Sequence, residues 1–130
     1  MEHELVDIAR KYVGVKYWFK GRSRGGLDCA GVAILSIREY TIPDYEYLEY
    51  SANPNPTHIK RELLKIADKV DSMQSGDIFL IRLHGAPQHV AIYTNNNTII
   101  HAYEDIGKVV EEKYTKYWQN KLDSIYRLRN

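Results

Sequence analysis

The sequence predicts one domain of the α+β class over residues 1–130, with helices in its first half and an antiparallel sheet in its second. In the first half, apolar residues recur at intervals of three and four, which is typical of helices that bury one face. After the turn sequence "QSGD" at residues 74–77, short apolar runs bounded by turn residues indicate strands. A chain that separates its helices from its strands in this way favours an α+β architecture around a single core.

The first part of the chain divides into two helices and two loops. The apolar spacing predicts an amphipathic helix over residues 4–12, and Gly14 ends it. A glycine-rich loop follows, after which Asp28 occupies the N-cap position of a strongly apolar helix that runs to about Tyr40. Residues 40–56 combine three prolines and four tyrosines with little periodicity, so we expect an ordered loop or short strand pieces there.

A third helix and five strands are expected beyond this loop. Thr57 can cap the helix, whose apolar face would consist of Ile59, Leu63, Leu64, Ile66 and Ala67. The strand sequences are "DIFLIRL", "HVAIYT", "TIIHAY", "KVVEEKY" and "SIYRLRN", which we expect to form an antiparallel meander. Three asparagines at residues 95–97 would form the turn between the second and third strands, since asparagine tolerates the left-handed backbone of tight turns.

Composition and charge argue against several partners. Eighteen basic and seventeen acidic residues leave a formal net charge of +1, so we expect no nucleic-acid partner, which would need a concentrated positive field. No apolar run approaches the length of a membrane span. The N-terminal sequence "MEHELVDIARKY" has no secretion signal, so the chain is expected to be cytoplasmic as synthesised.

The only cysteine, Cys29, lies in the stretch "RGGLDCAGVA" and has three open roles: a buried apolar residue, a metal ligand or a nucleophile. If Asp28 caps the helix, Cys29 occupies its first turn, where unpaired amides and the positive end of the helix dipole favour a thiolate. The glycine loop before it leaves room for a substrate, and the Cys29 amide can help to hold an oxyanion. The local sequence therefore shifts the balance toward the nucleophile and leaves the other two roles open.

A nucleophilic cysteine needs a base, and His89 and His101 are the strongest candidates. Both lie within predicted apolar strands, where an unpaired polar ring is costly. If the asparagines form the loop, Thr94 opposes Thr98, and the two histidines lie on the same face of the sheet as diagonal neighbours. A two-residue loop would place them on opposite faces. The other three histidines are assigned elsewhere: His3 to a chain end, His58 to a solvated helix turn and His84 to a loop.

Four segments follow one another over residues 13–102: "VGVKYWFKGRSRGGLDCAGVA", "SGDIFLI", "HVAIY" and "IIHA". In this combination the chain resembles the NlpC/P60 cysteine peptidases, a compact branch of the papain-like fold that acts on bacterial cell-wall peptides. The resemblance implies N-terminal helices packed on a five- or six-stranded antiparallel sheet. It also implies hydrolysis of a bond in a peptidoglycan stem peptide, by default the bond between γ-D-glutamate and a diamino acid, without a cofactor.

Carried over residue by residue, the resemblance implies a set of site roles. Cys29 would be the nucleophile, His89 the base that deprotonates it, and His101 the third polar residue, which fixes the tautomer and orientation of His89. Tyr17 matches a family tyrosine whose hydroxyl approaches the thiol and helps the oxyanion site. Asp28 matches the acidic residue before the cysteine, which would serve as a helix cap and as a contact for a substrate amino group.

Two departures from the family pattern concern the substrate. The family commonly has serine after the cysteine, where this chain has Ala30, so a hydroxyl implicated in holding the substrate's free amine is missing. The usual double glycine soon after the tyrosine is replaced here by Lys20 and Gly21. Both changes leave the chemistry intact and bear on which peptide is cut.

Three alternatives stay open. A CHAP-type amidase or endopeptidase of the same fold would use an acid or asparagine as its third partner, and His101 favours the NlpC/P60 family instead. Cys29, His89 and His101 are also competent zinc ligands. A structural or docking module would retain the fold, with a phage-tail or other assembly partner delivering it to the cell wall. The tyrosine-rich segment 40–50 would then be a contact surface, whereas in an enzyme it would flank the substrate groove.

Overall fold

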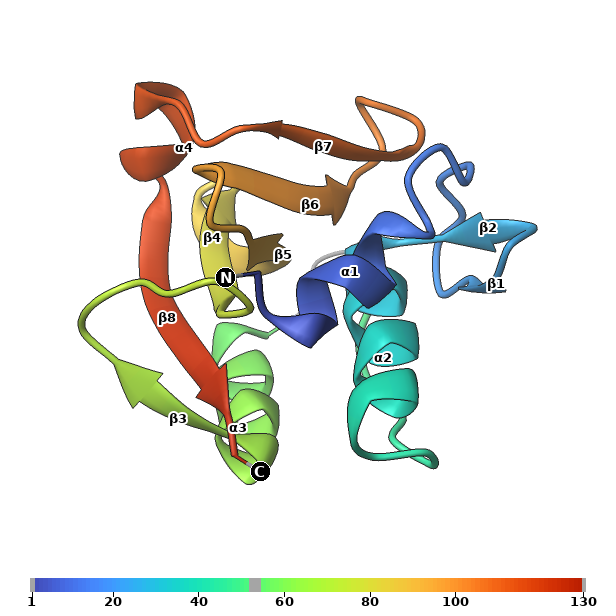
Figure 1. The fold of residues 1–130 in the computed structure, drawn as a ribbon, viewed down its shortest axis with the longest axis horizontal. Coiled ribbons are helices and arrows are strands. Elements are labelled where there is room, and N and C mark those ends of the chain that lie inside the picture. The colour runs from blue at the N-terminus through green and yellow to red at the C-terminus, as the bar shows by residue number, and fades with distance from the viewer. Residues whose placement is uncertain (1, 52–54, 130) are drawn as a thin grey trace.

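A computed structural model describes residues 2–51 and 55–129. These residues form eight strands and four helices, α1 (Glu4–Arg10), α2 (Cys29–Tyr40), α3 (Pro56–Ile66) and α4 (Lys116–Gln119) (Figure 1). The three longer helices precede the main sheet in the chain, which confirms the α+β class. No helix within the described ranges combines the length and the apolar character needed to cross a membrane.

Six strands form one antiparallel sheet in the order β3-β8-β4-β5-β6-β7, in agreement with the expected five or six. A separate short hairpin lies in the glycine-rich loop before α2 and consists of β1 (Arg22–Ser23) and β2 (Gly26–Leu27). The strands of the main sheet are β3 (Ala67–Val70), β4 (Ile78–Leu83), β5 (Ala86–Tyr93), β6 (Thr98–Ala102), β7 (Val109–Lys113) and β8 (Leu122–Leu128).

The expected meander is wrong for the last strand. Strands β4 to β7 follow one another across the sheet, but β8 returns to pair with the free side of β4, and β3 pairs with β8 at the edge. The first four residues of β4 are buried whichever face they point to, so its backbone groups need a strand on each side. Edge strand β3 escapes prediction because Asp68 and Lys69 are exposed and its sequence does not alternate.

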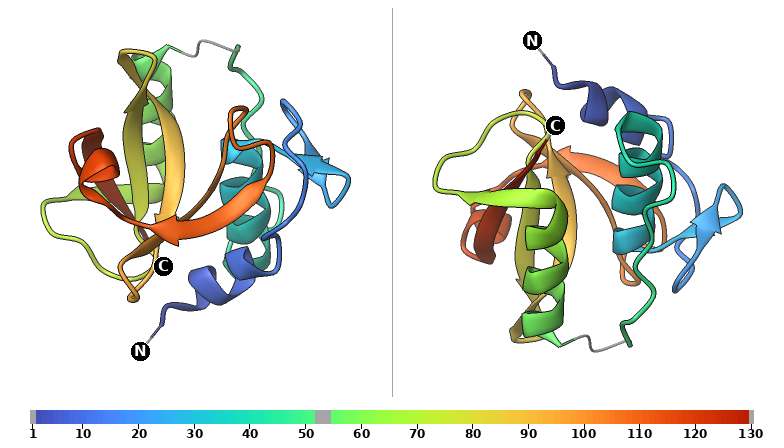
Figure 2. Two further views of the ribbon diagram at one scale, coloured as in Figure 1. Left: turned by 90° about the horizontal axis from the view of Figure 1, so that it is seen from above. Right: turned by 90° about the horizontal axis from the view of Figure 1, so that it is seen from below.

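The sheet is covered on both faces, which explains the continuous burial of β4. On one face, Ile78 and Leu80 belong to a core that includes residues of α1, α2 and α3. On the other face, Phe79 and Ile81 pack with Trp118 of α4. Figure 2 shows α2 and α3 on the same side of the sheet. The larger core therefore holds the start of α2 against the sheet, where α2 packs on β5.

The helix caps agree with the sequence for α2 and differ for α3. Asp28 caps α2, as predicted. Helix α3 is capped by Asn55 rather than Thr57, because the Asn55 side chain accepts a hydrogen bond from the Thr57 amide. Pro56 takes the first helical position, where its missing N–H costs nothing. Leu64, expected on the apolar face, is 48% exposed.

The turn between β4 and β5 is tighter than the expected loop "HGAPQ". His84 and Gly85 alone form this turn. Their φ angles are positive, 54° and 81°, as the left-handed backbone of a two-residue hairpin turn requires. The register of β5 against β4 then shifts at Gln88, which forms a bulge directly before His89. Pro87 is tolerated beside this irregularity.

Strands β5 and β6 pair in the predicted register. Ile92 lies opposite Ile100, and the Thr94 amide donates to the Thr98 carbonyl, which leaves residues 95–97 as the loop. The two histidines of these strands therefore share one face, as the pairing predicts.

Candidate active site

Cys29 is the first residue of α2 and lines a cleft of about 290 Å³. His89 lines the same cleft from β5, which packs against α2. Tyr17 and Asp28 reach the cleft from the chain before α2. Four of the residues singled out in the sequence therefore meet in one concave site. His101 is fully buried and lies behind His89.

The two histidines are in direct contact. The distance from His89 Nε2 to His101 Nδ1 is 2.7 Å, and the exposed fractions of the two residues are 2% and 0%. Their rings meet edge to face, with centroids 5.0 Å apart. Since His89 uses Nε2 toward His101, its Nδ1 is the nitrogen left to act on a group in the cleft.

The chain of polar contacts continues beyond His101 to Glu112 of β7, a residue that the sequence analysis missed. His101 Nε2 lies 2.7 Å from Glu112 Oε2, and the Trp118 indole N–H donates to Glu112 Oε1 at 3.1 Å. A signal for this contact exists in the strand pattern. Val110 is the partner of His101 across β6 and β7, so Glu112, two residues further, is a diagonal neighbour on the same face.

Burial decides the charge states of the histidine pair. Desolvation lowers the pKa of His89 well below its ordinary 6.5, and the neighbouring His101 lowers it further. Desolvation also lowers the pKa of His101, although Glu112 acts in the opposite direction. Both rings are therefore neutral at pH 7, and each carries one proton on one of its two nitrogens.

The thiol of Cys29 is also neutral at rest. The residue keeps part of its surface exposed. Desolvation and the negative charge of Asp28 nevertheless raise the pKa of the thiol to about 12. The backbone N–H groups of Val90 and Ala30 act in the opposite direction and lower this pKa. No hydrogen bond joins this thiol to His89 among the described residues. The helix-start position therefore does not produce the resting thiolate that the sequence suggests, because burial removes water from the sulfur and the helix cap brings a carboxylate next to it.

Tyr17 and Ala30 occupy different sides of the nucleophile candidate. Burial, Cys29 and Asp28 together raise the pKa of Tyr17 to about 12, so its hydroxyl stays protonated and can donate a hydrogen bond into the cleft. Ala30 instead lines an apolar pocket on the other side of Cys29. The position at which the resemblance implies a serine therefore borders apolar side chains in this chain.

Asp28 is occupied by donors from its own chain. Its Oδ1 accepts from the Gly31 amide at 2.7 Å and from Arg22 Nη1 at 3.3 Å. Its Oδ2 accepts from the Lys20 amide at 2.8 Å and from the Tyr50 hydroxyl at 2.6 Å. Only 2% of the residue is exposed. A substrate amino group would have to displace one of these four donors to reach the carboxylate.

Arg22 ties the tyrosine-rich segment to the site. Its Nε donates to Glu46, and its Nη2 donates to the Tyr47 carbonyl and to the Tyr50 hydroxyl. Residues 42–51 contain neither helix nor strand, as the loop prediction expected, and residues 52–54 of that loop lie outside the described residues. The segment runs beside the cleft, which Tyr50 helps to line.

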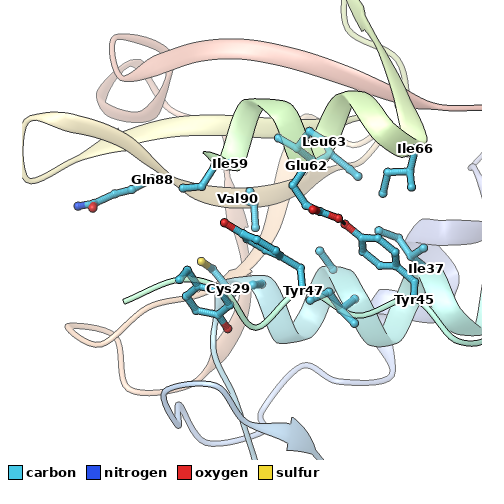
Figure 3. Close-up of a pocket in the computed structure, with 15 residues that line it drawn as sticks. Cys29, Ile37, Tyr45, Tyr47, Ile59, Glu62, Leu63, Ile66, Gln88 and Val90 are labelled. Carbon is cyan, nitrogen blue, oxygen red and sulfur yellow. Dashed lines mark hydrogen bonds between the residues drawn. The ribbon is translucent and has the colours of Figure 1, made fainter. Parts of the chain in front are cut away.

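An apolar pocket of about 70 Å³ lies between α2 and α3, beneath this segment. Figure 3 shows Cys29 toward one end of it and Ile37 and Ile66 toward the other. The Tyr47 hydroxyl is buried and has no hydrogen-bond partner within the described part of the chain. Cys29 thus lies between the cleft that contains His89 and an apolar pocket.

The zinc alternative finds no ligand set in the part of the chain that the structure describes. No group of three or more His, Cys, Asp or Glu side chains there is placed to hold a metal ion. The facing nitrogens of His89 and His101 are 2.7 Å apart, which is the separation of a shared proton rather than of two metal ligands.

Acidification from pH 7.5 to 5.5 is expected to lower the free energy of unfolding. The pKa values of His89 and His101 in the folded chain lie below the 6.5 of an unfolded histidine. The unfolded chain therefore takes up protons first, and stability that is present above pH 6.5 is lost as the pH falls, by on the order of 1 kcal/mol per pH unit for each ring at most.

Urea unfolding at pH 7.5, 6.5 and 5.5 checks this dependence, and His89→Gln should flatten it by about half. This window stays above the range in which the carboxyl groups titrate. A stability that is flat across the window in the unmodified protein would contradict the neutral histidine pair.

Known proteins resemble this chain in sequence and in fold. The family model described as the NlpC/P60 family matches residues 14–127. The murein DD-endopeptidase/murein LD-carboxypeptidase MepS of Escherichia coli K12 is 26% identical over 128 residues, which cover 98% of this chain. The probable endopeptidase NlpC of the same organism is 27% identical and covers 95% of this chain and 76% of its own length. The chain spans 63% of the length of MepS.

Solved structures agree with the fold. The NlpC/p60 domain of the peptidoglycan hydrolase SagA superposes with a TM-score of 0.70 at 21% identity, covering 96% of this chain and 97% of that domain. An NlpC/P60 family protein from Bacillus cereus gives a TM-score of 0.69 at 22% identity, over 96% of this chain and 39% of its own. Since the family model extends over most of the sequence, from the loop before α2 to the last strand, this chain belongs to the NlpC/P60 family.

Proposed function

We propose that this domain is a cysteine peptidase that hydrolyses peptide bonds in peptidoglycan stem peptides through Cys29, His89 and His101. The observation that carries the proposal is the buried 2.7 Å contact between the two histidines, directly behind a cleft that contains the only cysteine. This arrangement supplies a nucleophile, a base and a group that orients the base. The name of MepS, a murein DD-endopeptidase and LD-carboxypeptidase, supports the choice of substrate.

The mechanism follows from the neutral resting state. As the Cys29 sulfur attacks a peptide carbonyl carbon, the thiol proton passes to His89 Nδ1, so the transfer accompanies the attack rather than preceding it. The Cys29 amide and the Tyr17 hydroxyl can donate to the oxyanion that forms. His89 then gives its proton to the leaving amine, and a thioester remains on the sulfur. Water, deprotonated by the same ring, hydrolyses the thioester and restores the thiol.

Two classes of bond are proposed for the cleavage. The family resemblance favours the bond between γ-D-glutamate and a diamino acid. The filled carboxylate of Asp28 and the methyl of Ala30 remove two groups that would hold a free amine. The apolar pocket beside Cys29 suits a small uncharged side chain such as that of alanine. These features favour the second class, a DD-endopeptidase or LD-carboxypeptidase bond such as the name of MepS describes.

Digestion of purified muropeptides tests the proposal. The protein should release fragments from a disaccharide tetrapeptide or from its cross-linked dimer, and mass analysis of the new ends identifies the bond. Because the chain has one cysteine, iodoacetamide modifies Cys29 alone, and the modified protein is the matched control. Equal product from treated and untreated protein, or none from either between pH 5 and 8, would overturn the enzymatic proposal.

Delivery of the domain to the cell wall by a phage tail or another assembly stays a proposal from the sequence alone. Where in the cell the protein is made and where it acts are likewise proposals from the sequence alone.

A further inference from the structure

We propose that Glu112 is a positioning residue of this site, and that its carboxylate sets the direction of the proton chain through both histidines. The inference rests on the proposed function, since it concerns how His89 is prepared as a base. The carboxylate would determine which nitrogen of each histidine ring carries the proton, and this tautomer can be measured whether or not the protein cleaves a peptide.

The direction of the chain follows from donor and acceptor counts. A carboxylate only accepts, so the 2.7 Å contact with Glu112 places the His101 proton on Nε2. A neutral His101 then has a bare Nδ1, which must accept the 2.7 Å hydrogen bond from Nε2–H of His89. A neutral His89 with its proton on Nε2 has a bare Nδ1. That nitrogen is the one available to take a proton from Cys29.

Trp118 holds the carboxylate in its working orientation. Its indole N–H, which can only donate, occupies Glu112 Oε1 at 3.1 Å and leaves Oε2 for His101. The indole ring also packs edge to face on the His101 ring, with centroids 5.0 Å apart. Tyr103 packs on both histidines, and it is the other titratable side chain in ring contact with them.

Glu112→Gln should reverse the chain without removing a side chain. The Trp118 N–H will donate to the oxygen of the new glutamine amide, because the opposite orientation would place the amide NH₂ against the indole N–H, donor against donor. The amide NH₂ then faces His101, which must accept at Nε2 and carry its proton on Nδ1. His89 consequently accepts at Nε2, and its own proton moves to Nδ1, where it blocks the uptake of the thiol proton.

Long-range ¹⁵N NMR of the histidine rings reads these tautomers directly. The unmodified protein should show Nε2–H on His89 and on His101, and Glu112→Gln should show Nδ1–H on both. The rate of muropeptide hydrolysis should fall by about 10²-fold or more, as for other sites whose histidine is held in the wrong tautomer. The neighbouring variant Glu111→Gln is the matched control, since Glu111 pairs with Arg10 and Thr98 instead. It should keep both tautomers and activity within about threefold.

A second substitution separates the effect of the glutamine amide's orientation from the effect of any loss of protein stability. In Glu112→Gln/Trp118→Phe, the donor that fixes the amide is gone, so the glutamine oxygen can turn to His101 and restore Nε2–H on both rings. This double variant should be at least about tenfold more active than Glu112→Gln alone, although it is the less stable of the two. Trp118→Phe alone provides its reference.

Unchanged tautomers in Glu112→Gln would overturn the inference, whatever happens to activity. Reversed tautomers with activity within threefold of the unmodified protein would overturn the positioning role. An unmodified protein that shows the expected tautomers and cleaves no muropeptide would instead count against the proposed function, while the proton chain would stand.

Discussion

Replacing Cys29 by alanine is expected to lower the rate of stem-peptide hydrolysis by at least about 10³-fold, because no other thiol exists in the chain to form the thioester. His89→Ala should cost a similar factor, since its ring lines the cleft and makes a hydrogen bond to a second histidine behind it. The two losses should not add in the double variant, because the groups act as one unit. Hydrolysis of a purified muropeptide under single-turnover conditions is the measurement.

The control for these variants is His58→Ala. His58 is exposed near the start of α3, outside the cleft, so activity should stay within about twofold. Circular dichroism and the unfolding midpoint must show that each variant folds. A folded Cys29→Ala protein with a tenth or more of the original activity would refute the nucleophile assignment.

Asp28→Ala is expected to lower the free energy of unfolding by about 3 kcal/mol. The substitution removes the cap of α2, which typically contributes about 1 kcal/mol. It also leaves the largely buried Arg22 guanidinium without one of its two carboxylate partners, and it leaves the Lys20 amide without its acceptor. Because α2 carries Cys29 on its first turn, hydrolysis should fall together with stability.

Asp28→Asn is the matched comparison for this prediction. Its side-chain oxygen can still cap α2, so urea unfolding at pH 7 should show a loss about half that of the alanine variant. Asp28 is also one cause of the raised pKa of the Cys29 thiol, so removing the charge should lower that pKa and speed alkylation at pH 8. Equal stability of the alanine variant and the unmodified protein would show that the four hydrogen bonds to Asp28 do not support the fold.

Local chemistry made several features predictable from the sequence. The N-cap of α2 depends on a side chain and an amide three residues apart, Asp28 and Gly31, and it was predicted correctly. The register of β5 on β6 depends on a three-residue loop and the alternation of side chains, so the meeting of His89 and His101 could also be predicted. In both cases the interacting groups are close in the chain or are related by a simple strand pairing.

Other features depend on contacts between distant segments. Strand β8 pairs with β4 because a strand buried on both faces needs two neighbours, and this need does not specify which segment supplies the second one. The hairpin β1–β2 and the edge strand β3 are too short or too polar for a periodic signal. The protonated state of the Cys29 thiol was not foreseen, because the balance between helix start, burial and the Asp28 charge exists only in the folded chain.

The sequence by itself therefore determined the α+β class, the start of α2 and the common face of the two histidines, since each rests on short-range spacing. Only the tertiary structure decided that Glu112 and Trp118 lie behind His101, and that Arg22 and Tyr50 close over Asp28. The physical reason is the same for both sets. Buried polar groups must find partners in whatever segments packing brings beside them, and those partners are chosen by the arrangement of the whole sheet and its loops.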